Sequence, residues 1–366
     1  MEIKDFLTEK WMTDYERQAK VNLTDTSAQS WSLQELLALE PEQPDFLLDY
    51  GWIDGDPDLR KEILSLYQDQ RDETLTITNG ALQANEMIMS ILLHPGDHVI
   101  TITPGYQQFS EFPKWLGCEV SEVELTQDWT LDLDRLKEAI RPKTRLIIFD
   151  NPSNPTGMVL DQKQLEKLAA ICKAHDLWLV IDEVYRDLDG SMPSLSDLYE
   201  KSAVTGSLSK TMGLAGLRLG WIKGNPTLVD QIRTFRDYTI ICAGPVSEKL
   251  AALALRNREF LLERYHQILD ENHQMVKEWL SQSQLFSCHL ASKGPVQFLQ
   301  LPDGVRSEPF CKALIEQTGI FFVPGATFGK EGYVRFGLGK KQENLMEALR
   351  TLEDFTLQYM ENQKNR

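Results

Sequence analysis

Cysteine and histidine are scarce in this sequence, and neither type is arranged as a set of ligands. The five cysteines and six histidines are scattered over 366 residues. Such wide spacing predicts neither a disulfide framework nor a zinc or redox motif, and it gives metal catalysis no support. We therefore expect a protein of the reducing cytoplasm, with its cysteines serving as small core residues.

Long apolar runs and basic residues are also in short supply. No run approaches the roughly 18 residues that a membrane helix needs, and residues 1–12 lack the basic start and apolar stretch of a signal peptide. Lysine and arginine number 38 against 55 aspartates and glutamates, which gives a net charge of -17. This charge repels nucleic-acid phosphates and anionic membranes. We expect neither as a partner, and any anionic ligand needs a local group of donors.

The sequence does have enough apolar residues, 42%, for sizeable cores, and its length favours two domains. From residue 31 onward, short apolar runs alternate with helical patterns. The predicted strands are Leu75–Thr78, His98–Ile102, Arg145–Phe149, Trp178–Ile181 and Ala203–Thr205, and the helices between them include Ala84–Leu93, Leu131–Ile140 and Gln162–His175. Buried strands alternating with helices predict an α/β fold whose mostly parallel sheet is covered on both faces.

The rest of the chain has a different pattern. A long helix is predicted over Val246–Leu280, followed by mixed elements: strands Pro295–Leu301, Gly319–Val323 and Tyr333–Leu338, and helices Glu308–Gln317 and Gln342–Glu361. We expect three parts: an N-terminal arm (1–30) with a helix over Ile3–Ala19, a large domain (31–255), and a smaller α+β domain (256–366). The arm is expected to pack on the small domain.

Lysine 210 stands in the most distinctive motif. Gly206-Ser-Leu-Ser-Lys210 follows a short strand, and Arg218 comes eight residues later. A lysine next to two hydroxyls, with an arginine close behind, suits a covalent amine beside a bound phosphate. Taken alone, a surface lysine at a helix start is the simpler interpretation.

Candidate binding residues follow four other predicted strands. Asp182 ends one strand and Asn154 follows another, at the edge where open parallel sheets bind ligands. Gly80-Ala81-Leu82 leads from strand into helix, where backbone N–H groups can hold a phosphate. Tyr106 follows a fourth strand and can lay its ring against a cofactor. Each has a plain structural alternative: a helix-capping acid, a rigid turn, a βα turn and a core aromatic.

Together these elements resemble the class I and II aminotransferases of the fold-type I pyridoxal-phosphate superfamily. The resemblance runs from about Trp31 to the C-terminus and rests on six elements in order: Gly80-Ala81-Leu82, Tyr106, Asn154-Pro-Thr-Gly157, Asp182-x-x-Tyr185, Ser207-x-Ser-Lys210 and Arg218. It implies a large three-layer αβα domain with a mostly parallel sheet and a smaller α+β domain. A chance match to six ordered elements is far less probable than a match to any one.

The resemblance also implies roles for single residues. Lys210 forms the internal Schiff base with pyridoxal 5'-phosphate and moves the substrate's α-proton. Asp182 holds the ring nitrogen, while Asn154 and Tyr185 hydrogen-bond the phenolic oxygen. Tyr106 stacks on the ring. The phosphate is held by Gly80, the amides of Ala81 and Leu82, Ser207, Ser209 and Arg218.

Two further matches concern substrate and assembly. Tyr333-Val-Arg335-Phe-Gly-Leu is similar to the family's carboxylate clamp, so that Arg335, with Asn154, binds the substrate; a structural arginine is the alternative. Tyr50-Gly-Trp-Ile-Asp-Gly55 resembles the segment whose tyrosine reaches the phosphate of a neighbouring subunit, which implies a homodimer. No second arginine is evident for a distal carboxylate, and Leu23–Ser30 matches no pattern that we can assign, although its polar side chains suit a polar substrate.

The function predicted first is an aminotransferase that moves an amino group between an L-amino acid and a 2-oxo acid by a ping-pong mechanism. A carbon–sulfur β-lyase or a cyclising lyase or synthase stays open as an alternative, because such enzymes share Lys210 and Asp182 and differ in the pocket. A non-catalytic regulator is disfavoured, since no basic helix-turn-helix precedes the enzyme-like region.

Overall fold

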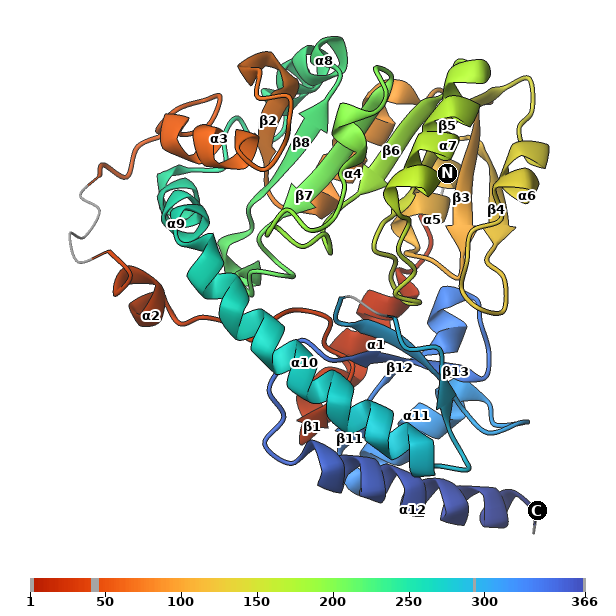
Figure 1. Ribbon diagram of the computed structural model, residues 1–366. Helices are drawn as coiled ribbons and strands as arrows, with labels where there is room; N and C mark the ends of the chain where they lie inside the picture. Colours follow the sequence, from red (N-terminus) through yellow and green to blue (C-terminus); the bar gives the residue numbers. More distant parts are fainter. Residues whose placement is uncertain (1–2, 41–45, 292–293, 365–366) are drawn as a thin grey trace.

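The computed structural model describes residues 3–40, 46–291 and 294–364, and the strands of this part form three sheets (Figure 1). The large sheet lies in the upper half of the view and has the strand order β2-β8-β7-β6-β5-β3-β4. Its strands are β2 (Leu75–Thr78), β3 (His98–Thr103), β4 (Glu119–Glu124), β5 (Thr144–Asp150), β6 (Trp178–Asp182), β7 (Ser202–Ser207) and β8 (Gly220–Gly224).

The large sheet is parallel except at one strand. Only β8 runs antiparallel to its neighbours, β2 and β7. The strands β5 and β6 are almost wholly buried, which agrees with their continuous apolar runs. The predicted α/β class, with a large and mostly parallel sheet, is confirmed.

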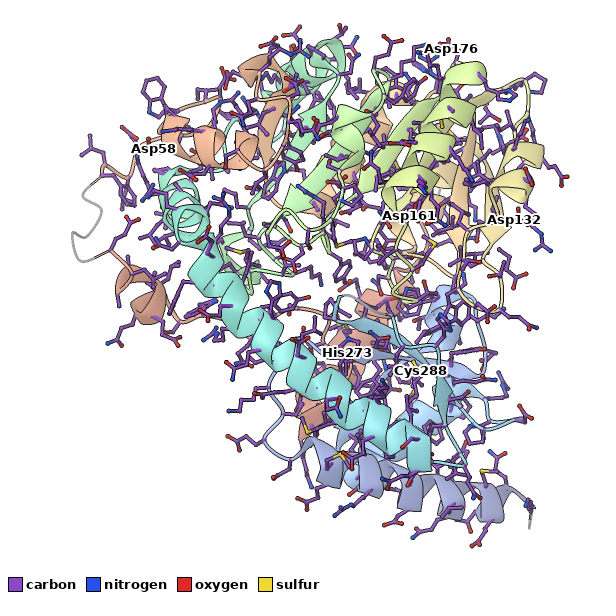
Figure 2. All side chains as sticks on the ribbon, viewed as in Figure 1. Asp58, Asp132, Asp161, Asp176, His273 and Cys288 are labelled. Carbon is purple, nitrogen blue, oxygen red and sulfur yellow. The ribbon has the colours of Figure 1, made fainter. Side chains whose placement is uncertain are left out.

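Helices cover this sheet on both faces (Figure 1). They are α3 (Pro57–Leu64), α4 (Ala81–Leu92), α5 (Gln108–Trp115), α6 (Leu133–Glu138), α7 (Gln162–Ala174), α8 (Pro226–Arg236) and α9 (Pro245–Arg256). Asp161, labelled in Figure 2, shows why α7 begins where it does. Its carboxylate accepts from the backbone N–H of Gln164 at 2.8 Å, and the Gln164 side chain binds back to the Asp161 N–H at 2.9 Å. Such a reciprocal cap fixes the first turn and is worth about 1 kcal/mol.

The lower half contains a four-stranded antiparallel sheet of order β12-β13-β10-β9 and a separate two-stranded sheet of β1 and β11. The strand β1 of the arm pairs in parallel with β11. The elements here are α1 (Leu7–Tyr15), β1 (Val21–Asn22), α2 (Leu33–Leu37), α10 (Arg258–Gln282), β9 (Ser287–Cys288), β10 (Val296–Gln300), α11 (Ser307–Thr318), β11 (Ile320–Phe321), β12 (Val323–Pro324), β13 (Tyr333–Gly337) and α12 (Leu345–Lys364).

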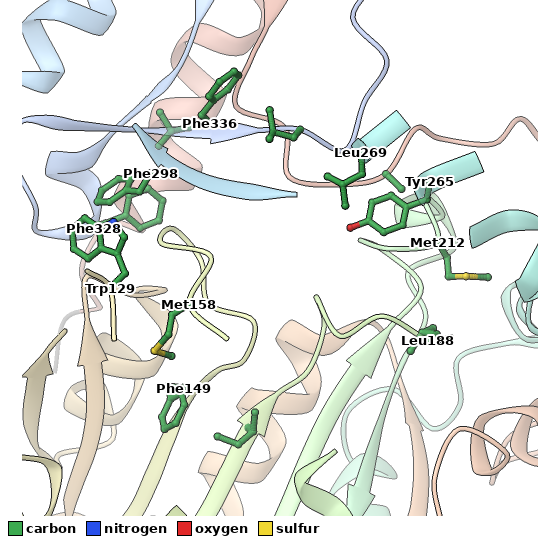
Figure 3. Packing of buried hydrophobic residues seen from close by; sticks show 14 of the residues in the cluster. Trp129, Phe149, Met158, Leu188, Met212, Tyr265, Leu269, Phe298, Phe328 and Phe336 are labelled. Atoms are coloured by element: carbon green, nitrogen blue, oxygen red, sulfur yellow. The ribbon is translucent and has the colours of Figure 1, made fainter. Parts of the chain in front are cut away.

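An aromatic group joins the two halves. Trp129, from the loop after β4, lies 5.6 Å from the Phe298 ring and 5.2 Å from the Tyr333 ring, centroid to centroid. Figure 3 shows Trp129 beside Phe298 and Phe328, with Met158 below them. Ring pairs of this kind add about 0.5–1.5 kcal/mol each beyond burial. They therefore help to fix the small sheet over the edge of the large one.

Several predicted elements differ in extent. The helix predicted over Val246–Leu280 is two helices, because Asn257 leaves helical geometry (φ -104°, ψ 22°) and turns its side chain to the Leu253 carbonyl and to Glu40. The strand predicted over Gly319–Val323 is split between two sheets, as β11 and β12. The arm helix begins at Leu7 rather than Ile3. The domain boundaries at residues 30 and 255 stay predictions.

Four strands were not predicted at all: the two-residue strands β1 and β9, and the strands β4 and β8 of the large sheet. In the edge strand β4 three exposed glutamates flank and separate the half-buried pair Val120 and Ser121 and the buried Val123, so the strand lacks an apolar run. Glycines begin and end β8 and a lysine lies inside it, which hides it from a search for apolar strands. Within the described ranges, no helix combines the length and apolar character needed to cross a membrane.

Candidate active site

Strand register brings the predicted polar residues to one edge of the large sheet. Asp150, Asp182 and Thr205 are direct partners across the parallel strands β5, β6 and β7. Because parallel strands end together, the residues that follow them gather at this edge. Asn154 and Tyr185 lie within the turns after β5 and β6, and Lys210 follows β7 by three residues.

Asp182 is a buried carboxylate held by neutral donors. One oxygen accepts from Asn85 Nδ2 at 2.7 Å and the other from the Val184 backbone N–H at 2.9 Å. Burial, with only 5% of the residue exposed, raises the pKa of Asp182, and the hydrogen bonds from Asn85 and Val184 oppose that rise. No cationic side chain of the described residues bonds to it. A positively charged ligand group would offset the energetic cost of burying this carboxylate.

Lys210 points its amine at the Thr26 hydroxyl, which in turn lies beside that of Tyr185. Its Nζ donates to Thr26 Oγ1 at 3.2 Å, and Thr26 Oγ1 lies 2.8 Å from the Tyr185 hydroxyl. The same Nζ is 5.5 Å from the centre of the Tyr185 ring. The amine is therefore placed among neutral groups, where it can react with an electrophile or move a proton.

Arg335 is a buried cation whose partners, among the described residues, are neutral. Its Nε donates to Thr24 Oγ1 at 3.2 Å and one terminal nitrogen to Asn154 Oδ1 at 3.5 Å, while the other lies 3.8 Å from the Met12 sulfur. Only 5% of the residue is exposed, and no carboxylate of the described chain pairs with it. A buried guanidinium without an anion is costly, so this geometry suits a ligand carboxylate.

The residues predicted to bind phosphate lie around the start of α4. Ser207 on β7 and Thr78 on β2 are both partners of Gly220 on β8. A side chain at Gly220 would come within 2.5 Å of the Gly80 carbonyl carbon, so glycine is needed for this close approach. The Arg218 guanidinium lies against Gly80. Ser209 donates its backbone N–H to Ser207 Oγ at 3.2 Å, and Ala81 and Leu82 open the helix.

Tyr106 stands where the arm meets the large sheet. Its ring centre lies 5.0 Å from that of Phe6, and burial raises the pKa of its hydroxyl. The Asp182 and Arg335 charges also act on that hydroxyl, in opposite directions. A cleft of about 660 Å³ opens beside it, lined by the arm and by Phe328.

Tyr50 does not lie with the other predicted residues. It is 68% exposed, and its backbone carbonyl accepts from the Cys242 thiol at 3.1 Å. Its proposed role requires a second subunit, so its exposure in a single chain leaves that role a prediction.

Sequence reasoning missed Thr24, Thr26, Asn85 and Asp150. The two threonines belong to the segment that matched no known pattern, and Asn85 lies inside an amphipathic helix. Asp150 directly follows the predicted strand Arg145–Phe149, but the motif around Asn154 predicted no role for it. For Asn85 the available signal is chemical, because a buried side-chain amide in a helix needs hydrogen-bond partners. Asn85 hydrogen-bonds to Asp182 and Thr205.

Asp150 is unusual because one of its oxygens has no hydrogen-bond partner in the described chain. Its Oδ2 accepts from the Asn154 backbone N–H at 2.8 Å, whereas Oδ1 is buried and unpaired. Burial raises the pKa of Asp150 from 3.8 to about 8, opposed by the Asn154 amide and assisted by the charge of Asp182. Folding therefore favours the protonated acid.

This raised pKa predicts a pH-dependent stability. A carboxyl whose pKa rises on folding stabilises fully below its unfolded pKa and loses that contribution as the pH rises through the folded pKa. Relative to Asp150→Asn, the unmodified protein without cofactor should lose stability between pH 4 and pH 8, by at most about 1.4 kcal/mol per pH unit. Urea unfolding at a series of pH values measures the difference. Parallel profiles for the two proteins would contradict this prediction.

Comparison with known proteins decides the family. The sequence pattern of the family described as aminotransferase class I and II matches residues 21–352. The chain belongs to this family. A crystal structure of a PLP-dependent aminotransferase from Streptococcus suis superposes with a TM-score of 0.93, at 36% identity, covering 98% of this chain and 99% of that one. The protein is accordingly a pyridoxal-phosphate-dependent aminotransferase that acts on amino and oxo acids, and the predicted family, cofactor and activity are confirmed.

Curated relatives of this aminotransferase differ in their named substrates. An aspartate aminotransferase of Pyrococcus abyssi is 29% identical over 327 residues, 84% of each chain. A capreomycidine synthase of Streptomyces vinaceus is 25% identical over 358 residues, 94% of this chain and 92% of the relative. Membership of the family therefore leaves the substrate to be argued from the site.

The residues present fit the cofactor of this aminotransferase. A buried acid without a cation, Asp182, suits a protonated ring nitrogen. The tight approach of Gly220 to the start of α4, with Arg218 alongside, suits a phosphate. The amine of Lys210, hydrogen-bonded to the Thr26 hydroxyl, lies in the same site.

Proposed function

We propose that Lys210 is the catalytic amine of this aminotransferase and that Asp182 and Arg335 hold the two charged groups on which the reaction depends. One observation supports this most strongly. Asp182 and Arg335 are opposite charges, both 5% exposed, and neither has an oppositely charged hydrogen-bond partner among the described residues. Buried charges without counterions are rare in proteins, and the cofactor's cationic ring and the substrate's carboxylate supply the missing partners.

Each residue then has a definite task. The bound cofactor supplies an electron sink for the bond broken at the substrate's α-carbon. Lys210 would hold the cofactor through its aldehyde, and its free amine would take and return the substrate proton. Tyr185 and Asn154 hydrogen-bond the phenolic oxygen, and Tyr106 covers the ring. The phosphate is held by Gly80, Ala81, Leu82, Ser207, Ser209 and Arg218.

Covalent labelling tests this assignment. Borohydride reduction of the cofactor-loaded protein, followed by peptide mass analysis, should find the cofactor on Lys210. A panel of amino acids with and without a 2-oxo acid then tests the outcome of the reaction. Nitrogen transferred to the oxo acid supports transamination, whereas ammonia and pyruvate without an acceptor support a lyase, and a cyclised product supports a synthase.

A substitution at Arg335 tests how the substrate is bound. Arg335→Lys should raise KM for every α-amino acid by about tenfold or more, because an ammonium cannot form the two parallel hydrogen bonds of a guanidinium, with a smaller effect on kcat. Steady-state kinetics with several substrates measures the change. Arg306→Lys, a change of the same type at the start of α11, is the matched control. A KM unchanged in Arg335→Lys would mean that another group binds the carboxylate.

A homodimer completes the proposal. Leu47, Leu48, Tyr50 and Trp52 form an exposed apolar segment, with Leu48 exposed by 82%. This segment lies against the start of α9, since a side chain at Gly51 would be in van der Waals reach of Pro245. Exposed apolar patches of this kind mark interfaces. The second copy would bring Tyr50 to the phosphate of its neighbour.

We propose the cytoplasm as the location of this protein, in keeping with its unpaired cysteines.

A substitution at Leu48 tests the proposed dimer. Leu48→Glu should shift the protein from dimer to monomer, because a charge would be buried in the interface, and cofactor affinity should fall about tenfold or more as Tyr50 is withdrawn. Sedimentation analysis and cofactor titration measure both effects. Leu357→Glu is the control, since Leu357 is a 50% exposed leucine on α12. A native protein that is monomeric and fully active would contradict the dimer.

A further inference from the structure

Thr26 connects two residues of the proposed machinery. The residue is 2% exposed, and its single hydroxyl lies 3.2 Å from Lys210 Nζ and 2.8 Å from the Tyr185 hydroxyl. It belongs to neither of the strands that deliver those residues. Thr26 comes instead from the arm, between β1 and α2.

The arm is held tightly on both sides of Thr26. The Ala28 backbone N–H donates to the carbonyl of Lys210 itself at 2.8 Å. On the other side, side chains at Gly337 and Gly339 would overlap the carbonyl oxygens of Asp25 and Ser27. Glycine at both places lets the small sheet approach the arm backbone directly. The Thr26 hydroxyl is therefore fixed relative to the Lys210 amine.

The protons available on each group set the direction of the hydrogen bonds between Lys210, Thr26 and Tyr185. Lys210 Nζ donates a hydrogen bond to Thr26 Oγ1, as an ammonium, which has donors only, must do. The threonine hydroxyl has one proton of its own, and the Tyr185 oxygen is its other neighbour within hydrogen-bond reach in the described chain. If Tyr185 donated instead, the Thr26 proton would be buried without an acceptor, which is costly. The chain of donors thus runs from Lys210 to Thr26 to Tyr185, and the Tyr185 proton is left for another acceptor.

We propose that Thr26 is a positioning residue that holds the free Lys210 amine in place and directs the Tyr185 hydroxyl toward the cofactor's phenolic oxygen. The proposal rests on the functions proposed above for Lys210 and Tyr185. Hydrogen bonds in a chain polarise one another, so that Thr26 strengthens the bond that Tyr185 donates. The proposed carboxylate site is supported by a different threonine, since Arg335 Nε donates to Thr24 Oγ1.

The test compares Thr26→Val with Thr26→Ser. Valine keeps the shape and removes the hydroxyl, whereas serine keeps the hydroxyl. In holoenzyme, Thr26→Val should raise the pH midpoint of the cofactor's visible absorption band by a few tenths of a pH unit, because Tyr185 then donates a weaker hydrogen bond. It should also lower kcat about tenfold, the effect of losing one hydrogen bond at a charged group, with KM within about twofold. Thr26→Ser should restore both quantities.

Thr24→Val is the matched control, because Thr24 is a buried threonine of the same segment with a different partner. It should raise KM through Arg335 and leave the pH midpoint unchanged. Should Thr26→Val fail to fold, the pair Thr26→Ala and Thr26→Ser makes the same comparison. An unchanged midpoint in Thr26→Val, or a loss in Thr26→Ser equal to that in valine, overturns the inference. If borohydride leaves Lys210 unlabelled in the unmodified enzyme, the proposed function fails instead.

Discussion

Replacing Lys210 with alanine is expected to lower kcat by about a thousandfold or more, because both the covalent attachment of the cofactor and the proton transfer depend on this amine. The variant should keep its fold, since Lys210 makes one side-chain hydrogen bond, to Thr26. It should also lose the borohydride-stable label on the peptide that contains position 210. Single-turnover kinetics, circular dichroism and peptide mass analysis measure the three properties.

Lys201 is the matched control for this experiment. It lies just before β7, at the opposite end of the strand from Lys210, and pairs with Asp176, which is labelled at the far edge of the large sheet in Figure 2. Lys201→Ala should leave kcat unchanged and cost at most about 1 kcal/mol, because exposed ion pairs contribute little. Normal turnover by Lys210→Ala would refute the assignment of the amine.

Removing the charge of Asp182 is expected to have the second largest effect. Asp182→Asn keeps the size of the side chain but removes the anion, so that the positive charge on the cofactor's ring nitrogen is no longer stabilised. We expect proton removal from the substrate to slow by about a hundredfold or more, the scale of losing one electrostatic contact in a buried site. Cofactor affinity should fall as well. Exchange of the substrate's α-proton with solvent, followed by nuclear magnetic resonance, measures the first effect.

Asp176→Asn is the control for Asp182. Asp176 precedes β6 at the end opposite to Asp182 and has a positive φ of 56°, a conformation that asparagine tolerates. Its loss should leave proton exchange unaffected. Equal exchange rates in Asp182→Asn and the unmodified enzyme would mean that another group keeps the ring protonated.

The residues that could be predicted from the sequence are those attached to buried parallel strands. Asp182 and Lys210 follow apolar runs, and position after such a run is enough to place a side chain at the ligand-binding edge. Thr24 and Thr26 could not be found in this way, because their segment has no periodicity. Its position depends on contacts with residues about 180 and 310 positions away in the chain.

The missed elements of the fold have similar causes. The interruption at Asn257 follows from a side chain bonding to the backbone and to Glu40, a contact that helical periodicity does not report. The strand β8 was hidden by its glycines. Gly220 is glycine because the turn before α4 lies against it, which is a tertiary reason with no local signal.

The direction of β8 has a consequence for how this site can change. Since β8 runs against β7, residues 208–219 leave the sheet and return to it at the same edge, with Lys210 and Arg218 near the two ends of the excursion. Within this excursion Met212 is fully buried and Gly213 lies against the Gln29 carbonyl oxygen, whereas Ala215 and Gly216 are exposed. Changes of length or composition are therefore tolerated only at this short exposed turn, since the rest of the excursion ties the lysine segment to the arm.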